Sequence, residues 1–402
     1  MVKPELLSPA GNSEQLIMSL TYGADAVYLG GQSFGLRAAA GNFRSEEMPD
    51  AIALCHKFGA GAYITCNAIL TSDEMRALPG FLEEISDAGA DAVIVSDIGA
   101  IALIRKYAPS VEIHISTQAG VFNHESARAF YDLGASRIIL ARELPLYEIA
   151  QIRSNAPQEL DLEAFVHGSM CVAMSGRCLL SHYLAGRDAN RGECAQPCRW
   201  KYSLVEEQRP GEYLDISEDS GTYIMNSRDL CMIEHIKEMA DAGISALKIE
   251  GRMKSAYYAA VATNAYRHAI DAAASELPLK DVWREEVNKI NHREYSTGFY
   301  FDHNGPGQYC GDSMYRCECD VVAIVESCGS DGSAVLTQRN KFYRGDQLEL
   351  LTPLDEPVVF TVNNITDADG QEIDSTPHPM MKLNIKLPKF AQRYSILRKY
   401  RN

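Results

Sequence analysis

A short phrase recurs four times in this chain, and it limits the possible folds more than any other feature. It reads GADAVYLG at 23–30, GADAVIVS at 89–96, GASRIILA at 134–141 and GISALKIE at 243–250. In each copy an amphipathic run ends at a glycine, which can close a helix in the left-handed conformation, and an apolar strand follows. The phrase therefore predicts the repeated helix-to-strand joint of a parallel β-sheet.

Eight such strands can be placed along the chain. They cover 5–10, 25–31, 61–67, 91–97, 112–118, 137–143, 162–168 and 246–252. Helical patterns alternate with them, which predicts eight βα units closed into a TIM barrel whose active site lies at the carboxyl ends of the strands. An open doubly wound sheet is the alternative, but no glycine-rich phosphate loop follows the first strand.

The regular spacing breaks once, between the seventh and eighth strands. We expect a cysteine-rich insertion and a β-hairpin there, at 169–226, within a barrel domain that covers 1–312. Because the insertion leaves the carboxyl end of a strand, it should hang over the active site. Short alternating strands follow, so 315–402 is predicted to form a separate small β-barrel domain.

Composition limits the compartment and the partners. We find no apolar run of the roughly twenty residues that a bilayer span needs and no signal-peptide pattern, so we expect a cytoplasmic protein without a membrane partner. A net charge of −16 argues against broad nucleic-acid binding. The cysteine-rich segment is locally basic, and Arg187 and Arg191 are candidate RNA contacts there. Alternatively, these arginines pair with carboxylates of the barrel rim.

Polar residues gather at the predicted strand ends. They are Asn67, Asp97, His114, Ser116, Gln118, Arg142, Glu143, His167, Glu250 and Arg252. Arg142 and Arg252 could bind carboxylates or phosphate, and His114 and His167 could transfer protons. Any one of them could instead be a buried polar group whose hydrogen bonds are all made within the barrel. Neither a nucleophile elbow nor an HExxH zinc helix is present.

Five cysteines stand out among the eleven of the chain. Cys171, Cys178, Cys194 and Cys198 lie in one segment, and Cys231 follows at the expected start of the next helix. Reduced thiols in clusters favour metal ligation or catalysis over disulfides. Four thiolates suit an iron–sulfur cluster; zinc and unligated thiols are the alternatives.

The run EAFVHGSMCVAMSGRCLLS at 163–181 resembles the signature of the collagenase-like peptidase family U-32. The segments ELLSPAGN, NRGECAQPCRW, NSRDLC and LKIEGRMKSAYY continue the resemblance over nearly the whole chain. It implies an oxygen-independent hydroxylase with a 4Fe-4S cluster, since members of this family act in ubiquinone synthesis or on RNA with prephenate as hydroxyl source. The resemblance implies Cys171, Cys178 and Cys194 as cluster ligands, with Cys198 or Cys231 as the fourth.

The short C-terminal domain with FYRGDQLELLTP is similar to the branch of tRNA hydroxylation proteins, which make 5-hydroxyuridine at the wobble position. This implies tRNA as a partner and prephenate as cosubstrate. The expected site then uses Asn67, Gln118, Arg142 and Arg252 to bind prephenate, His114, His167 and Glu250 for catalysis, and Arg187 and Arg191 to guide a flipped uridine.

Three other functions remain open at this point. They are a metal-dependent peptidase, a related hydroxylase with another substrate, and an RNA-binding accessory factor with a structural cluster.

Overall fold

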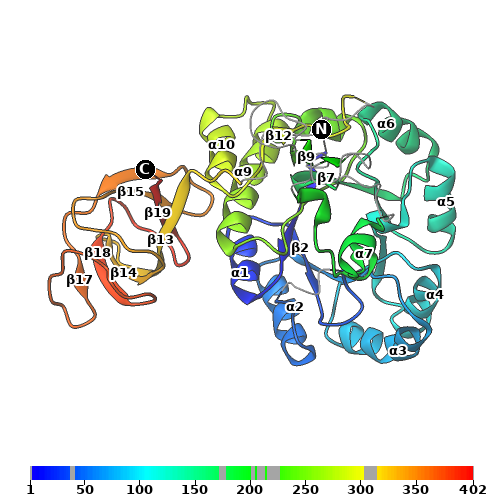
Figure 1. Ribbon diagram of the computed structural model, residues 1–402, viewed down its shortest axis with the longest axis horizontal. Helices are drawn as coiled ribbons and strands as arrows, with labels where there is room; N and C mark the ends of the chain where they lie inside the picture. The colour runs from blue at the N-terminus through cyan, green and yellow to red at the C-terminus, as the bar shows by residue number, and fades with distance from the viewer. Residues whose placement is uncertain are drawn as a thin grey trace.

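The computed structural model describes residues 2–36, 41–171, 178–200, 227–302 and 315–401, together with two short strands at 204–205 and 213–214. Figure 1 shows a round body of strands ringed by helices and a second, smaller body made of strands. Within the described residues no helix is both long and apolar enough to cross a membrane.

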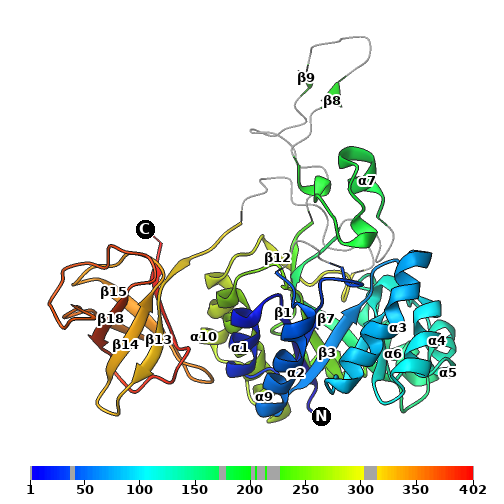
Figure 2. The same cartoon turned by 90° about the horizontal axis from the view of Figure 1, so that it is seen from below.

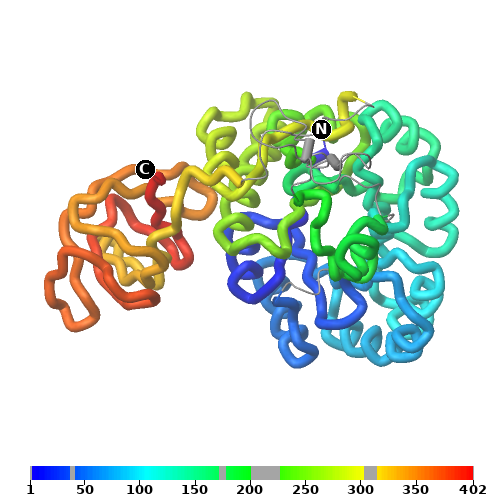
Figure 3. Tube along the Cα trace, viewed as in Figure 1, coloured from blue at the N-terminus to red at the C-terminus, as the bar shows by residue number. Residues whose placement is uncertain are grey.

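Eight parallel strands form the larger body. They are β1 (Glu5–Ala10), β2 (Ala26–Gly30), β3 (Gly61–Cys66), β4 (Ala92–Val95), β5 (Glu112–Ile115), β6 (Arg137–Ile139), β7 (Asp161–Ser169) and β11 (Ala246–Ile249). They pair in the order β11-β1-β2-β3-β4-β5-β6-β7, and β11 also pairs with β7, which closes the ring. The predicted TIM barrel is therefore confirmed, and the tube in Figure 3 shows the closed ring.

Helices cover the outside of the ring. They are α1 (Ser13–Thr21), α2 (Met48–Lys57), α3 (Ser72–Asp87), α4 (Ile98–Tyr107), α5 (His124–Asp132), α6 (Leu146–Asn155), α8 (Ile236–Asp241), α9 (Ala256–Ala274) and α10 (Asp281–Glu286). The four glycines of the recurring phrase all have positive φ: Gly23 102°, Gly89 83°, Gly134 101° and Gly243 91°. Because side chains disfavour that conformation, the glycines end the helices as the sequence predicts.

The insertion after β7 contains α7 (Leu180–Ala185), the 3-10 turns η3 (Ala189–Arg191) and η4 (Pro197–Arg199), and the paired strands β8 (Leu204–Val205) and β9 (Tyr213–Leu214). Figure 2 shows α7 and this hairpin beyond one end of the barrel, opposite the N-terminus. The chain returns as β10 (Asp229–Cys231), antiparallel to β7, and β12 (Tyr295–Ser296) pairs with β10. Cys231 thus ends a strand, and the expectation that it starts a helix is wrong.

The smaller body is one antiparallel sheet of seven strands. These are β13 (Cys319–Cys328), β14 (Ser333–Gln338), β15 (Gln347–Leu351), β16 (Val358–Thr361), β17 (Thr366–Asp367), β18 (Lys382–Lys386) and β19 (Ile396–Tyr400). Their order is β16-β15-β19-β13-β14-β18-β17. The sheet curls around its own apolar core, but in the described residues its edge strands β16 and β17 do not pair, so the predicted barrel is open on that side.

Candidate active site at the barrel mouth

A pocket opens at the carboxyl ends of the barrel strands. Its non-atom space, counted out to the open rim with solvent included, is about 500 Å³. It is lined by Tyr28, Leu36, Thr65, Asn67, Ile94, Ser116, Thr117, Gln118, Ile139, Arg142, Phe165, Lys248, Glu250 and Arg252. Six of the ten polar residues predicted for the strand ends are in this set: Asn67, Ser116, Gln118, Arg142, Glu250 and Arg252.

The strand β11 and the loop after it supply three charged groups to the pocket. Lys248, Glu250 and Arg252 all line it, because alternate residues of an extended chain face the same side. Leu247 and Ile249 face the other way and pack in the core between strands and helices. The alternation therefore puts two cations and one carboxylate on a single wall.

Arg252 makes hydrogen bonds to three acceptors at the pocket wall. Its guanidinium donates hydrogen bonds to the backbone oxygen of Leu36 (3.3 Å), to Oγ1 of Thr65 (3.0 Å) and to the side-chain oxygen of Asn42. A Cβ on Gly30 would collide with this guanidinium. Glycine at position 30 thus makes the space that Arg252 needs.

Arg142 forms another wall of the pocket. Its Nη1 donates to the backbone oxygen of Ser169 (2.9 Å), and its guanidinium carbon lies 3.9 Å from the ring centroid of Phe165. A planar guanidinium fixed by stacking is well suited to bind a carboxylate with two parallel hydrogen bonds. Arg142 and Arg252 therefore give the pocket an affinity for acids.

Neutral donors and acceptors complete the pocket. The Tyr28 hydroxyl donates to the backbone oxygen of Ile249 (2.9 Å) and lies 3.4 Å from Oε2 of Glu250. Asn67 donates from Nδ2 to Oγ of Ser116 (3.2 Å) and accepts from a backbone N–H. Two further residues of the predicted set do not line the pocket: Asp97 caps α4 through Ala100, and Glu143 is half-buried.

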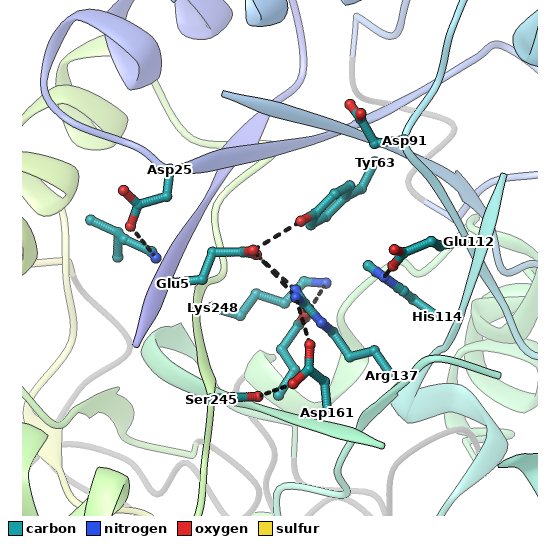
Figure 4. Close-up of polar contacts among 12 residues, drawn as sticks. Glu5, Asp25, Tyr63, Asp91, Glu112, His114, Arg137, Asp161, Ser245 and Lys248 are labelled. Carbon is teal, nitrogen blue, oxygen red and sulfur yellow. Dashed lines mark hydrogen bonds and ion pairs between the residues drawn. The ribbon is translucent and has the colours of Figure 1, made fainter. Parts of the chain in front are cut away.

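Ion pairs fill the barrel beneath the pocket (Figure 4). Arg137 lies at their centre, with nitrogen–oxygen distances of 2.7 Å to Glu5, 3.2 Å to Asp161 and 3.3 Å to Glu163. The second oxygen of Glu163 lies 2.9 Å from Nζ of Lys248. Burial acts to raise the pKa of Glu163, but the two cations outweigh it and hold the pKa below its usual range. The interior of this barrel is thus a layer of compensated charges, with Lys248 at its upper edge.

His114 belongs to this lower layer and does not line the pocket. Its side chain is fully buried, its Nε2 lies 3.2 Å from Glu112, and its ring meets Tyr63 edge-on, with centroids 4.7 Å apart. Burial lowers the pKa of His114, although Glu112 partly offsets this. The structure therefore separates His114 from the group of mouth residues.

His167 also lies outside the pocket. It is 1% exposed and is surrounded by the rings of Tyr258, Tyr266 and Tyr295, with centroids 5.8, 5.3 and 5.4 Å away. Hydroxyls of Tyr266 and Tyr295 lie 3.4 and 3.5 Å from its two ring nitrogens. Burial lowers the pKa of His167 to about 3, so the imidazole is neutral at physiological pH.

The thiol-bearing lobe at 178–200 is ordered by side chain–backbone hydrogen bonds. Asn190 donates from Nδ2 to the backbone oxygen of Cys178 (2.8 Å) and accepts from its N–H (3.4 Å). The N–H of Gln196 donates to Sγ of Cys194 (3.4 Å). These bonds fix the backbone of Cys178 and the position of the Cys194 sulfur.

Cys198 stands among the other thiols of the lobe. Burial raises its pKa, Arg199 lowers it, and the thiols of Cys171, Cys194 and Cys178 each raise it further. Each of these three thiols thus lies close enough to Cys198 to act on it electrostatically.

Cys231 lies opposite His167 on the neighbouring strand, close to the Tyr266 hydroxyl. Its sulfur is 3.8 Å from the Tyr266 hydroxyl and accepts from the N–H of Ile233, and burial raises its pKa to about 11. The structure therefore offers two different candidates for a fourth ligand: Cys198 among the other thiols, and Cys231 with donors aimed at its sulfur.

The donor set fits an iron–sulfur cluster in its chemistry. Among the residues that the structure describes, no three side chains of His, Cys, Asp or Glu already converge as a metal site. Residues 172–177, between Cys171 and Cys178, lie outside the described part. The nearby donors are thiols, and thiolates are the ligands that hold such clusters.

The two candidate RNA contacts differ in their surroundings. Arg191 donates to the backbone oxygen of Ile69 (2.7 Å) and to Glu74 (2.8 Å), and this bond, with those from Thr71, lowers the pKa of Glu74 to about 2. Arg191 therefore fixes the lobe to the barrel rim, as the alternative interpretation of the sequence expected. Arg187 is exposed.

Sequence reasoning missed Lys248 and Tyr28 as pocket residues. The signal for Lys248 was present, since it precedes Glu250 by two positions on the same strand. Tyr28 sits inside an otherwise apolar strand, and nothing in the local pattern separates its ring from a core side chain.

The fold and the site define a TIM-barrel protein with a charged pocket at its mouth and a thiol-rich lobe beside it. The sequence profile of peptidase family U32 matches residues 11–308, and that of the peptidase family U32 C-terminal domain matches residues 317–398. This chain belongs to peptidase family U32.

Relatives of this chain carry names that indicate more than one activity. tRNA hydroxylation protein P1 of Bacillus subtilis is 38% identical, over 99% of this chain and 95% of the relative. tRNA hydroxylation protein P of Escherichia coli is 36% identical, over 94% of this chain and 92% of the relative. A protein named collagenase, from Porphyromonas gingivalis, is 31% identical over 78% of this chain and 76% of the relative.

Proposed function

We propose that this chain is an oxygen-independent RNA hydroxylase that forms 5-hydroxyuridine at the wobble position of tRNA, with prephenate as the source of the hydroxyl group. The observation that carries the proposal is the mouth pocket, in which five residues predicted for this reaction meet. Near full-length similarity to two proteins named for tRNA hydroxylation supports the choice of RNA.

The pocket suits prephenate because prephenate carries two carboxylates. Arg142 and Arg252 present guanidinium groups from the segments that follow β6 and β11, and Asn67 and Gln118 add neutral polar groups. Charge-assisted bonds from two fixed arginines would orient the acid as well as bind it. In this proposal Glu250 is the acid or base, since it lines the pocket and neither His114 nor His167 does.

Cys171, Cys178 and Cys194, with Cys198 or Cys231, would hold a 4Fe-4S cluster. When bound, such a cluster supplies an electron-transfer or Lewis-acid centre at this end of the barrel. The chain's own contribution is to orient the thiols, through Asn190 at Cys178 and the N–H of Gln196 at Cys194.

The lobe also has the groups that a single-stranded nucleic acid needs. Arg187 is exposed, and the rings of Tyr183 and Trp200 are 77% and 42% exposed. Stacking on exposed rings and a nearby cation are the usual means of binding unpaired bases. A uridine must leave the base stack to react, and these side chains could receive it.

A peptidase is the second candidate, favoured by the relative named collagenase. The pocket gives it less support. Among the described residues no histidine lines the mouth pocket, so neither a hydroxyl–imidazole pair nor a histidine-held metal is assembled in it.

Mass spectrometry of tRNA nucleosides from a strain lacking the gene tests the proposal. We expect loss of 5-hydroxyuridine and its derivatives, restored by the wild-type gene and not by an Arg142→Ala variant. Unchanged nucleosides in a strain without a redundant pathway would refute it. Digestion of gelatin by the purified protein, inhibited by chelators, would favour the peptidase.

Anaerobic purification tests the cluster separately. We expect a brown protein with about four iron atoms per chain. Cys198→Ser and Cys231→Ser should then differ in retained iron, and the variant that loses more identifies the fourth ligand. Cys328→Ser, on the C-terminal sheet, is the matched control. Stoichiometric zinc in a colourless protein would rule the cluster out.

A further inference from the structure

Two lysines of the described part are buried, and their surroundings differ. Lys248 is 4% exposed and Lys289 is 3% exposed. A lysine ammonium has three N–H donors and no acceptor, and buried donors nearly always have partners. We therefore compare the hydrogen-bond acceptors that the protein itself offers to each ammonium group.

Lys289 is fully satisfied by carboxylates. Its Nζ lies 2.8 Å from Oε1 of Glu286, and 3.0 and 3.2 Å from the two oxygens of Glu349. Burial acts to lower its pKa, but these carboxylates raise it well above the usual value. Lys289 shows what a purely structural buried lysine looks like in this protein.

Lys248 is different because it has one acceptor. Its Nζ lies 2.9 Å from Oε1 of Glu163, and the faces of two rings lie 4.4 Å away at Tyr28 and 5.5 Å away at Phe165. Burial lowers the pKa of Lys248, and the carboxylates of Glu163 and, less strongly, Glu250 act against this. Glu163 is also shared with Arg137. Within the described residues two of the three ammonium donors therefore have no hydrogen-bond acceptor.

Lys248, which has a single hydrogen-bond acceptor, lies in the mouth pocket. Lys248, Tyr28 and Phe165 all line it, as does Arg142. A ligand that completes the ammonium needs an anionic oxygen, since a neutral carbonyl would leave more of the charge uncompensated in a site shielded from water. Uracil is uncharged at neutral pH and supplies only carbonyl oxygens.

We propose that Lys248 binds a carboxylate oxygen of a small organic acid at the floor of the mouth pocket. The pocket is then the site of the acid, and the nucleobase meets it from the open rim, on the side of the thiol-bearing lobe. Lys248 is thereby a further substrate-binding residue, beyond Arg142 and Arg252. The inference rests on the proposed function for the identity of the acid, prephenate.

Direct binding to the full-length chain tests the inference without requiring activity. Wild type, Lys248→Met and Lys248→Gln are titrated calorimetrically with prephenate, phenylpyruvate, malonate and 2-oxoglutarate. Removing the lysine should not orphan Glu163, because Arg137 still pairs with it at 3.3 Å. The control is Lys237→Met, which removes a lysine from the surface of α8.

We expect Lys248→Met to bind prephenate about 10- to 100-fold more weakly than wild type, as for loss of a charge-assisted hydrogen bond, with no change in the control. Affinity within about threefold of wild type in a folded variant overturns the inference and leaves the proposed function standing. If another acid of the panel binds in place of prephenate and needs Lys248, the inference stands and the proposed cosubstrate is wrong. If wild type binds none of the four, both are wrong.

Crystals of the wild-type chain soaked with prephenate give a second measurement, which does not depend on whether the variants fold. A carboxylate oxygen within about 3.2 Å of Nζ supports the inference. Prephenate bound in the pocket with its carboxylates away from Lys248 overturns it.

Discussion

Four buried charges join the two domains, and removal of one of them is a sharp test of the structure. Glu349 accepts from Lys289 at 3.0 and 3.2 Å and from Nε of Arg398 at 2.8 Å. Glu286 accepts from the same two cations, at 2.8 and 2.5 Å. Two anions thus balance two cations away from water, and β15 and β19 are held to the barrel helices.

The change Glu349→Gln removes one negative charge and keeps the shape. Each hydrogen bond to a charged group contributes about 1.5–3 kcal/mol, and the amide oxygen can keep one of them. Lys289 and Arg398 then share a single carboxylate, and breaking a buried pair costs roughly 3–5 kcal/mol. We therefore expect the free energy of unfolding to fall by about 3 kcal/mol.

Urea unfolding, followed by circular dichroism, measures this loss. The control is Glu326→Gln, which removes the partner of Lys382 (2.8 Å) from a partly exposed pair on the same sheet and should cost less than about 1 kcal/mol. A loss below about 1 kcal/mol for Glu349→Gln would refute the reasoning, because it would mean that water or relaxation replaces the missing charge.

The pH dependence gives a second check on the same residue. Burial acts to raise the pKa of Glu349, but Arg398 and Lys289 outweigh it and hold the pKa below its usual value. A carboxyl with a lowered pKa stabilises the fold above its unfolded pKa, about 4.3, and loses that contribution as the pH falls through the folded pKa. The difference between wild type and Glu349→Gln should therefore be full at pH 7 and shrink below about pH 4.

Three further substitutions test the mouth and the lobe. Gly30→Ala should displace the Arg252 guanidinium and weaken prephenate binding about tenfold or more, measured by calorimetry. Arg187→Ala should weaken tRNA binding and reduce the slope of log K against log salt by about 1, measured by filter binding. Glu74→Gln should release Arg191 and speed hydrogen exchange at 188–192, with less than about 1 kcal/mol lost in global stability.

Each of these has a matched control. Gly80→Ala adds a methyl where nothing lies within 4 Å and should leave binding unchanged. Arg105→Ala removes a cation from α4, remote from the lobe, and should keep the salt slope. Asp73→Asn breaks an exposed pair with Arg76 and should leave exchange at 188–192 unchanged. If a control variant changes the measured quantity as much as its test variant does, the corresponding prediction is contradicted.

The barrel could be read from the sequence because its signals are local. Glycines at 23, 89, 134 and 243 end helices, and the next apolar run starts a strand, so each joint is specified within about ten residues. The carboxyl ends of parallel strands meet at one face, which is why Asn67, Gln118, Arg142, Glu250 and Arg252 could be grouped in advance.

The burial of individual side chains and the identity of their hydrogen-bond partners could not be predicted from such local patterns. His114 and His167 lie on the predicted strands, but side-chain direction and helix packing put one among buried ion pairs and the other among tyrosines of α9 and β12. Arg191 could be recognised from the sequence as a basic residue, but its ion pair with Glu74 on α3, 117 positions away, could not.

The sequence by itself therefore determined the barrel and the insertion of a thiol-bearing lobe after its seventh strand, since these depend on residue type and spacing. Only the tertiary structure decided which charges are compensated. Lys289 meets two carboxylates and Lys248 meets one, and that difference arises from long-range packing that no local pattern records.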